Sequence, residues 1–117
     1  MSDYTKQNVE IANIILEQLG GNKFVVMTGA KHFKAIKNGL RMKIPKNKSK
    51  ANSLDITLNY DDTYTMRFYR YVAPRLNSKT LMMSEEKLEE VKKFEGVYFD
   101  QLQELFTEVT GMYTRLF

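Results

Sequence analysis

The stretch KHFKAIKNGLRMKIPKNKSK, residues 31–50, carries the clearest fold signal in this chain of 117 residues. Apolar and basic side chains alternate in LRMKI, residues 40–44, which predicts a half-buried strand with its basic residues facing outward. The dipeptide Asn38-Gly39 favours a tight type I′ turn, which needs positive φ at both central residues. Residues 31–37 then form the preceding strand of a hairpin, and Pro45 ends the second strand because it has no backbone donor.

The same stretch concentrates positive charge. It holds eight basic residues and no carboxylate, whereas the rest of the chain has ten basic and fourteen acidic residues, a net charge of −4. A surface of one sign attracts polyanions or acidic protein surfaces. Lysines can also protect sheet edges from aggregation without binding anything. We interpret the patch as a nucleic-acid contact, with a solvated surface as the alternative.

The residues on either side predict the remaining elements. A helix is expected from Ser2 or Asp3 to Leu19, with Val9 in its buried stripe, and Gly20-Gly21 ends it. KFVVMT, residues 23–28, is typical of a buried strand. Residues 46–52 are expected to be a mobile basic loop. Residues 54–60 alternate as a strand, and a turn at Asp61-Asp62 leads to a returning strand from residue 64.

The C-terminal third has the pattern of a long helix. Ser84 and the acidic residues after it resemble a helix start, and apolar residues follow at spacings of three and four up to residue 109. Gly96 lies in the middle of this pattern, and Gly111 is expected to cap its end. The sequence therefore predicts an α+β fold with an N-terminal helix, an antiparallel meander of four to five strands and a long C-terminal helix. Residues 1–117 form a single domain with the helices on one face of the sheet.

Composition limits location and chemistry. The chain has no cysteine, which fits a reducing cytoplasm and excludes disulfides and thiolate metal sites. It shows neither a signal peptide nor an apolar run near the roughly 20 residues of a membrane helix, so we expect a cytoplasmic protein without a membrane partner. MTGAK, residues 27–31, lacks the spacing of a phosphate loop. The lone His32 has no partner for a metal, and Asp55 and Asp61-Asp62 lack the further acidic ligands of a nuclease. We therefore expect a non-enzymatic protein without cofactor or metal.

The candidate binding residues come from the basic stretch and from the strand after residue 64. Arg41 and Lys43 would make fixed phosphate contacts from a strand face, and the loop lysines mobile ones. Arg67, Tyr69 and Tyr71 face outward on a nearby strand and could offer stacking surfaces, as in single-strand binders. The full predicted set is Lys34, Lys37, Arg41, Lys43, Lys46, Lys48, Lys50, Arg67, Tyr69 and Tyr71.

Several segments resemble one known family. Residues 18–33 (QLGGNKFVVMTGAKHF) and 105–116 (LFTEVTGMYTRL) are similar to short proteins of bacterial phages, prophages and related mobile elements. LDITLN at residues 54–59 and YTMRF at residues 64–68 share the resemblance. It implies an accessory protein in the cytoplasm of a bacterial host.

Two functions fit that setting. One is binding of DNA or RNA through the basic hairpin and loop. The alternative is a protein-interaction module that inhibits or modulates a host protein of defence or nucleic-acid processing. The apolar tail, residues 112–117, either folds back on the sheet or meets a second subunit in a homodimer.

Overall fold

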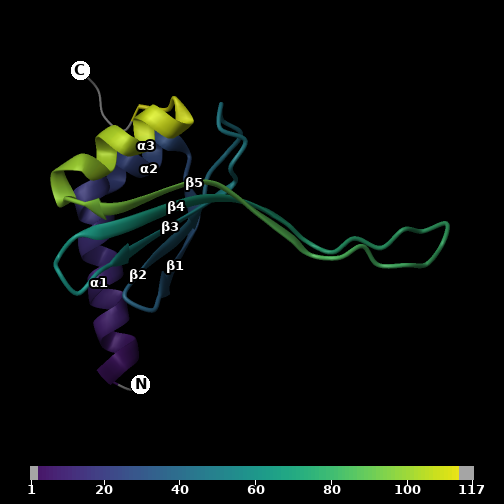
Figure 1. Ribbon diagram of the computed structural model, residues 1–117, viewed down its shortest axis with the longest axis horizontal. Helices are drawn as coiled ribbons and strands as arrows, with labels where there is room; N and C mark the ends of the chain where they lie inside the picture. The colour runs from purple at the N-terminus through teal and green to yellow at the C-terminus, as the bar shows by residue number, and fades with distance from the viewer. Residues whose placement is uncertain (1–2, 114–117) are drawn as a thin grey trace.

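The computed structural model describes residues 3–113 and confirms the α+β class (Figure 1). Ser2, a candidate helix cap, lies outside the described residues, as do residues 114–117 of the tail that we expected either to fold back on the sheet or to meet a second subunit. The five strands form one antiparallel sheet in the order of the chain, which is the expected meander. The elements are α1 (Asp3–Leu19), α2 (Asn22–Thr28), β1 (Lys31–Ile36), β2 (Gly39–Lys43), β3 (Ser53–Leu58), β4 (Tyr64–Val72), β5 (Lys87–Val97), a 3-10 turn η1 (Phe99–Gln101) and α3 (Leu102–Thr110).

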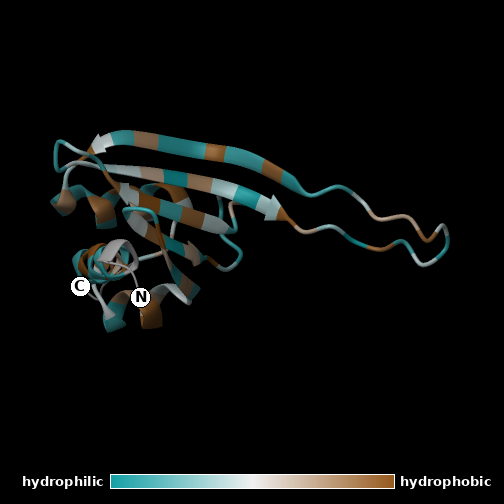
Figure 2. Cartoon of the chain, turned by 90° about the horizontal axis from the view of Figure 1, so that it is seen from below, coloured by the Kyte–Doolittle hydropathy of each residue, from teal (hydrophilic) through white to brown (hydrophobic). Residues whose placement is uncertain are grey.

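The helices lie together on one face of the sheet, and the core lies between the two layers (Figures 1 and 2). Three aromatic rings join the layers. Phe24 of α2 meets Phe106 of α3 edge to face at 5.0 Å, and Phe106 lies 6.3 Å from Phe68 of β4. Ile15 and Leu19 of α1 are fully buried beside them. Within residues 3–113 no helix lies on the opposite face of the sheet, which we call the open face.

The β1–β2 hairpin forms as expected, but its turn lies one residue earlier. Ile36 pairs with Gly39, so Lys37 and Asn38 make the turn and Gly39 begins β2. The Asn38 N–H donates to Asn8 Oδ1 of α1 at 2.9 Å, which fixes the turn to the helix layer. A Cβ on Gly39 would lie 2.2 Å from the carbonyl oxygen of Ile56, so the close approach of β2 to β3 requires glycine here.

Residues 23–28, expected as a buried strand, are instead helix α2. Gly21 and Gly29, with φ of 59° and 72°, bound this short helix, and the Gly29 N–H donates to Val25 O. Phe24 and Thr28 are one helical turn apart and both point into the core, whereas Val26 between them is 81% exposed. The β-branched residues therefore follow the packing of the core and not their intrinsic strand preference.

The prediction of a long C-terminal helix is wrong for its first half. Residues 87–97 form strand β5, and α3 begins only at Leu102. Glu, Lys and Leu favour helix locally, but β4 has a strong strand pattern and pairs with this segment along its length. Gly111 does cap α3 as expected, with φ of 75° and its N–H donating to Thr107 O.

Two bulges interrupt the pairing of β5 with β4. Tyr64 pairs with Val97 and Met66 with Phe94, so three steps on β5 oppose two on β4. Gly96 provides the positive φ, 66°, in this bulge. Phe94 and Val97 consequently both face the core although they are three residues apart, which is a helical interval. A second irregularity between Phe68 and Tyr69 again inserts an extra residue in β5.

Of the smaller expectations, one turn is confirmed and two predicted inward-facing residues are exposed. The turn at Asp61-Asp62 is present, and Asp61 accepts hydrogen bonds from the Thr63 backbone and hydroxyl. Val9, expected in the buried stripe of the first helix, is exposed. Tyr60, expected at the end of a half-buried strand, is exposed because β3 ends at Leu58. No helix within residues 3–113 is long and apolar enough to cross a membrane.

The connection between β4 and β5 forms a projecting arm, residues 72–86 (Figure 1). Asn52 bonds to the backbone of β4 as far as Tyr71, and beyond that point the two strands leave the sheet. Leu76 and Met83 pair across the arm as an antiparallel bridge. The longest dimension of the molecule, 49 Å, and the radius of gyration of 15.6 Å reflect this projection.

Candidate nucleic-acid interface

The open face brings together side chains from three neighbouring strands. The register places Arg41 of β2 opposite Asp55 of β3, and Asp55 opposite Arg67 of β4. Since directly opposed residues in antiparallel strands point to the same face, their side chains form one row across the sheet. A second row runs from Lys43 through Ser53 to Tyr69. Six of the ten predicted binding residues belong to this face: Lys34, Arg41, Lys43, Arg67, Tyr69 and Tyr71.

Arg41 is held by Asp55. Its Nε and Nη2 donate to Oδ1 and Oδ2 of Asp55, each at 3.0 Å, and the Tyr69 hydroxyl donates to Oδ1 at 2.9 Å. The hydrogen bond to Asp55 raises the pKa of Arg41 above its usual range. Burial raises the pKa of the Tyr69 hydroxyl, and the Asp55 charge adds to this effect. The network stabilises the sheet and neutralises the charge that Arg41 would offer to a phosphate.

Arg67 and Tyr69 also interact with other side chains of the protein. Arg67 Nε lies 3.1 Å from Glu90 Oε1, and its guanidinium covers the Tyr69 ring at 5.1 Å. Tyr69 is only 4% exposed, so the expectation that it stacks on a base is wrong. Tyr71, half-buried on the same face, keeps accessible ring surface.

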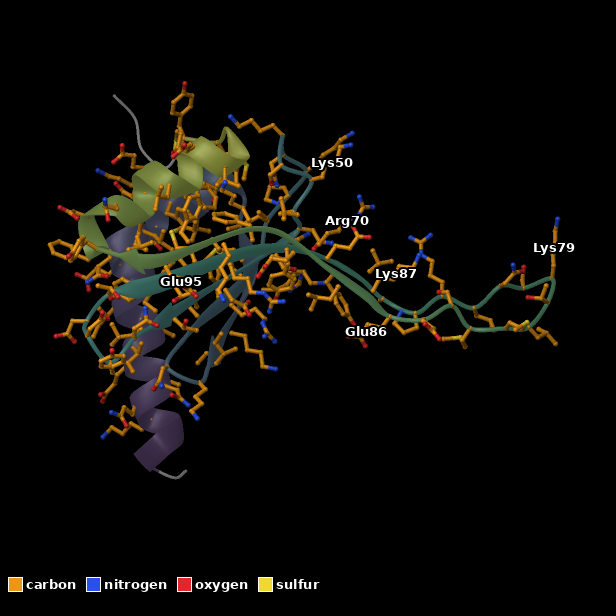
Figure 3. All side chains as sticks on the ribbon, in the orientation of Figure 1. Lys50, Arg70, Lys79, Glu86, Lys87 and Glu95 are labelled. Atoms are coloured by element: carbon orange, nitrogen blue, oxygen red, sulfur yellow. The ribbon has the colours of Figure 1, made fainter. Side chains whose placement is uncertain are left out.

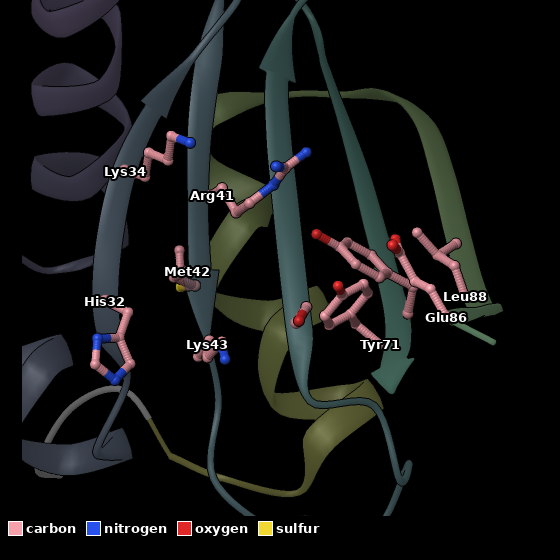
Figure 4. A pocket seen from close by; sticks show the side chains of 10 residues that line it. His32, Lys34, Arg41, Met42, Lys43, Tyr71, Glu86 and Leu88 are labelled. Atoms are coloured by element: carbon pink, nitrogen blue, oxygen red, sulfur yellow. The ribbon is translucent and has the colours of Figure 1, made fainter. Parts of the chain in front are cut away.

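A broad pocket of about 470 Å³ lies on the open face (Figure 4). Lys34 and Lys43 line it from one side, and Tyr71 with Glu86 and Leu88 from the other. No ion pair among the described residues involves Lys34 or Lys43. Two lysines without an ion pair among the described residues therefore border the same pocket as Tyr71, although Glu86 places a negative charge at the same rim.

The basic loop after β2 is tied together by Asn47. Its Nδ2 donates to the carbonyl oxygens of Pro45 and Ala51, both at 2.8 Å, and its Oδ1 accepts from the backbone N–H and the hydroxyl of Ser49. The Ser49 hydroxyl oxygen accepts in turn from the Ala51 N–H at 3.1 Å. These bonds hold the loop in a defined conformation.

A second pocket, of about 510 Å³, lies between this loop and the start of the arm. Lys46, Lys50 and Arg70 line it, and none of its described lining residues is acidic. We call these three residues the basic corner. Figure 3 shows Lys50 and Arg70 where the arm leaves the sheet. Glu89 lies opposite Arg70 in the register but does not line this pocket.

The sequence did not identify Arg70 as a binding residue, although a signal was present. Between residues 64 and 84 the chain has four basic residues and no carboxylate. Arg70 is one of them, and its side chain lies on the opposite face of β4 from Arg67 and Tyr69. Its closeness to Lys50, 20 residues earlier, depends on the loop conformation, which the sequence pattern could not supply.

Two predicted residues lie apart from these groups. Lys37 lies in the β1–β2 turn. The Lys48 backbone N–H donates to Thr110 O at 3.4 Å, so this part of the loop meets the C-terminal end of α3. Contact with Gly111 is close enough that a Cβ there would lie 3.2 Å from Lys48 Cδ. The predicted set therefore divides into the open face, the basic corner and these two outlying lysines.

The carboxylates considered in the sequence do not gather. Asp55 serves Arg41, while Asp61 and Asp62 lie in the β3–β4 turn. Within residues 3–113, no group of three or more histidine or acidic side chains is placed to hold a metal ion.

Comparison with known proteins adds no assignment. The chain matches no protein-family model, no curated protein and no solved structure. The candidate interface is therefore defined by geometry and charge alone.

Proposed function

We propose that this protein binds nucleic acid, with the basic corner as its main phosphate contact. The supporting observation is the pocket lined by Lys46, Lys50 and Arg70 with no acidic lining residue. Cations from two separate segments converge there, and no ion pair among the described residues involves any of the three. Phosphate contacts of this kind supply most of the affinity of non-specific nucleic-acid binding.

The loop network favours such a role. Asn47 fixes the backbone on both sides of Lys46 and Lys50 through the bonds to Pro45, Ala51 and Ser49. A loop that is already ordered loses less conformational entropy on binding than a disordered one. Only the side chains of the two lysines then need to be ordered on a phosphate.

The open face extends the proposed surface. Lys34 and Lys43 would contact further phosphates, and Tyr71 offers the accessible aromatic ring for stacking. Arg41 and Arg67 serve as structural residues in this account, because each has a carboxylate partner.

We propose a non-enzymatic accessory role for a phage or related mobile element, inside a bacterial host cell. Support for that setting comes from the resemblance of residues 18–33 and 105–116 to proteins of such elements. The function itself is argued from the charges of the basic corner.

Fluorescence anisotropy with labelled single- and double-stranded DNA and RNA tests the proposal. The test variant is Lys46→Glu/Lys50→Glu, and the matched control is Lys6→Glu/Lys23→Glu, which changes the net charge equally at exposed helix residues. We expect wild-type binding of roughly micromolar or tighter dissociation constant at low salt. The corner variant should bind at least about tenfold more weakly, and the control should bind nearly as well as wild type. Absence of wild-type binding at low salt, or equal weakening by both variants, would contradict the proposal.

A further inference from the structure

The tip of the arm exposes an unusual amount of apolar surface. Leu76, Leu81, Met82 and Met83 are 60%, 76%, 69% and 60% exposed. Figure 2 shows brown, hydrophobic segments along this projection, far from the core. Scattered exposed apolar residues are ordinary, but a contiguous group on a projecting element marks an interaction site.

The tip has a defined conformation. Asn77 and Met82 bond through their backbones at 2.9 Å, and the Leu81 N–H donates to Asn77 O at 2.7 Å. The Asn77 side-chain oxygen accepts from the Lys79 and Thr80 N–H groups. Leu81 adopts a positive φ of 59°, which is rare for leucine, and the residue is exposed. The apolar residues are thus presented by an ordered turn.

The charge of the arm changes along its course. The outgoing strand and the tip carry Arg70, Arg75 and Lys79 and no carboxylate, and acidic residues begin only at Glu85. Lys79 marks the far end of the arm in Figure 3, and Arg70 of the basic corner marks its base. A polyanion would therefore be attracted to the tip and to the Arg70 side of the base, and repelled from the returning strand at Glu85 and Glu86.

We infer that the arm inserts into the minor groove of double-stranded nucleic acid and wedges its apolar tip between base pairs. This inference rests on the proposed function. Leucine and methionine are among the residue types that unstack base steps in this way, and Leu81 and Met82 lie in the turn at the tip. Arg75 and Lys79 flank the apolar residues and would be drawn by the negative potential of the groove.

The dimensions agree with simultaneous contact at both ends of the arm. The nine residue-to-residue steps from Arg70 to Lys79 span about 30 Å when extended. A duplex whose backbone lies against Lys46, Lys50 and Arg70 would run beside the arm and bring a groove within its reach. Bending of the duplex toward the body would then increase the surface that the protein covers.

The test uses an end-labelled DNA duplex that reports bending by energy transfer and carries a fluorescent base analogue that brightens on unstacking. Wild type is compared with Leu81→Ser/Met82→Ser, and Ile14→Ser/Val26→Ser is the control at exposed apolar residues on helices. We expect bending and unstacking with wild type and with the control. The tip variant should lose both signals and about tenfold of its duplex affinity, while its affinity for single strands is unchanged.

The outcomes separate the inference from the proposed function. If wild type binds no nucleic acid, the proposed function fails. If wild type binds duplex without bending it, or if the tip variant bends duplex as wild type does, the arm inference is overturned and the proposed function stands. If the tip variant instead loses a protein partner that wild type retains in nuclease-treated bacterial lysate, while duplex binding is unchanged, the arm is a protein-docking element and the inference is also overturned.

Discussion

Arg41 and Asp55 form a two-pronged ion pair between β2 and β3, with Nε–Oδ1 and Nη2–Oδ2 distances of 3.0 Å. Asp55 is buried beneath it and also accepts the Tyr69 hydroxyl hydrogen bond. The arginine in the middle of the most basic stretch of sequence is thus committed to the fold. The lysines that follow it in the loop have no such partner among the described residues.

Asp55→Asn should destabilise the protein by about 1–3 kcal/mol, because it removes the charge that satisfies Arg41 and weakens the bond from Tyr69. Urea denaturation monitored by circular dichroism measures the change. Glu90→Gln is the control, since its pair with Arg67 is exposed and should contribute less than about 1 kcal/mol. Equal effects of the two substitutions would show that the Asp55 network has no special structural role.

Gly39→Ala should destabilise the fold by more than about 2 kcal/mol, because its Cβ would meet the Ile56 carbonyl oxygen at 2.2 Å. Gly96→Ala is the informative comparison. A Cβ at Gly96 meets nothing within 4 Å, so only the strain of its positive φ should remain, about 1–2 kcal/mol. Denaturant midpoints of the two variants measure the difference, and the reverse order would refute the register of β2 against β3.

Tyr69 should make stability decline at alkaline pH. Burial raises the pKa of its hydroxyl in the folded state above the ordinary value of 10.0. The resulting stabilisation is complete below the unfolded pKa and is lost as the pH rises through the folded pKa. Tyr69→Phe should therefore flatten the decline in unfolding free energy between about pH 9 and about pH 12. Some decline persists, because burial also raises the pKa of Tyr64. Identical pH profiles for wild type and variant would contradict this.

Asn47→Ala should weaken nucleic-acid binding without removing any charge. The variant loses the side-chain bonds that order the loop around Lys46 and Lys50, so the loop must be ordered on binding. We expect about a three- to tenfold loss of affinity with an unchanged dependence on salt. Anisotropy titrations at two or more salt concentrations measure both quantities. A changed salt dependence would mean that the loop does more than hold the lysines in place.

Strict alternation and turn chemistry made much of the fold predictable. The pattern in residues 40–44 gave the face of β2 correctly, with Leu40, Met42 and Ile44 buried. The glycines after α1 and α3 end those helices as expected. These features depend on local backbone geometry, which the residue types themselves determine.

The errors arose where packing between distant segments overrides local preference. Residues 87–97 have helix-forming composition, yet their pairing with β4 makes them a strand, which contains two bulges. Residues 23–28 have strand-forming composition, yet burial of Phe24 and Thr28 at one helical turn makes them a helix. The first of these errors also hid the arm, because a predicted helix starting at Ser84 leaves no second strand with which β4 could form it.

The candidate site was predictable as a list of charges but not as a surface. The sequence could not show that Asp55 neutralises Arg41, that Glu90 pairs with Arg67, or that Tyr69 is buried. Those outcomes depend on cross-strand register. The convergence of Arg70 on the loop lysines depends on the Asn47 network in the same way.

The salt dependence of binding shows whether the basic corner contacts phosphate. Wild type and Lys46→Gln/Lys50→Gln/Arg70→Gln are titrated with one labelled duplex over a series of salt concentrations, and the logarithm of the binding constant is plotted against that of the salt concentration. Each lost phosphate contact should lower the slope by about 0.9, so we expect a slope smaller by about 2–3 in the variant. Equal slopes and affinities for the two proteins would show that the basic corner does not contact phosphate, and the account would be wrong.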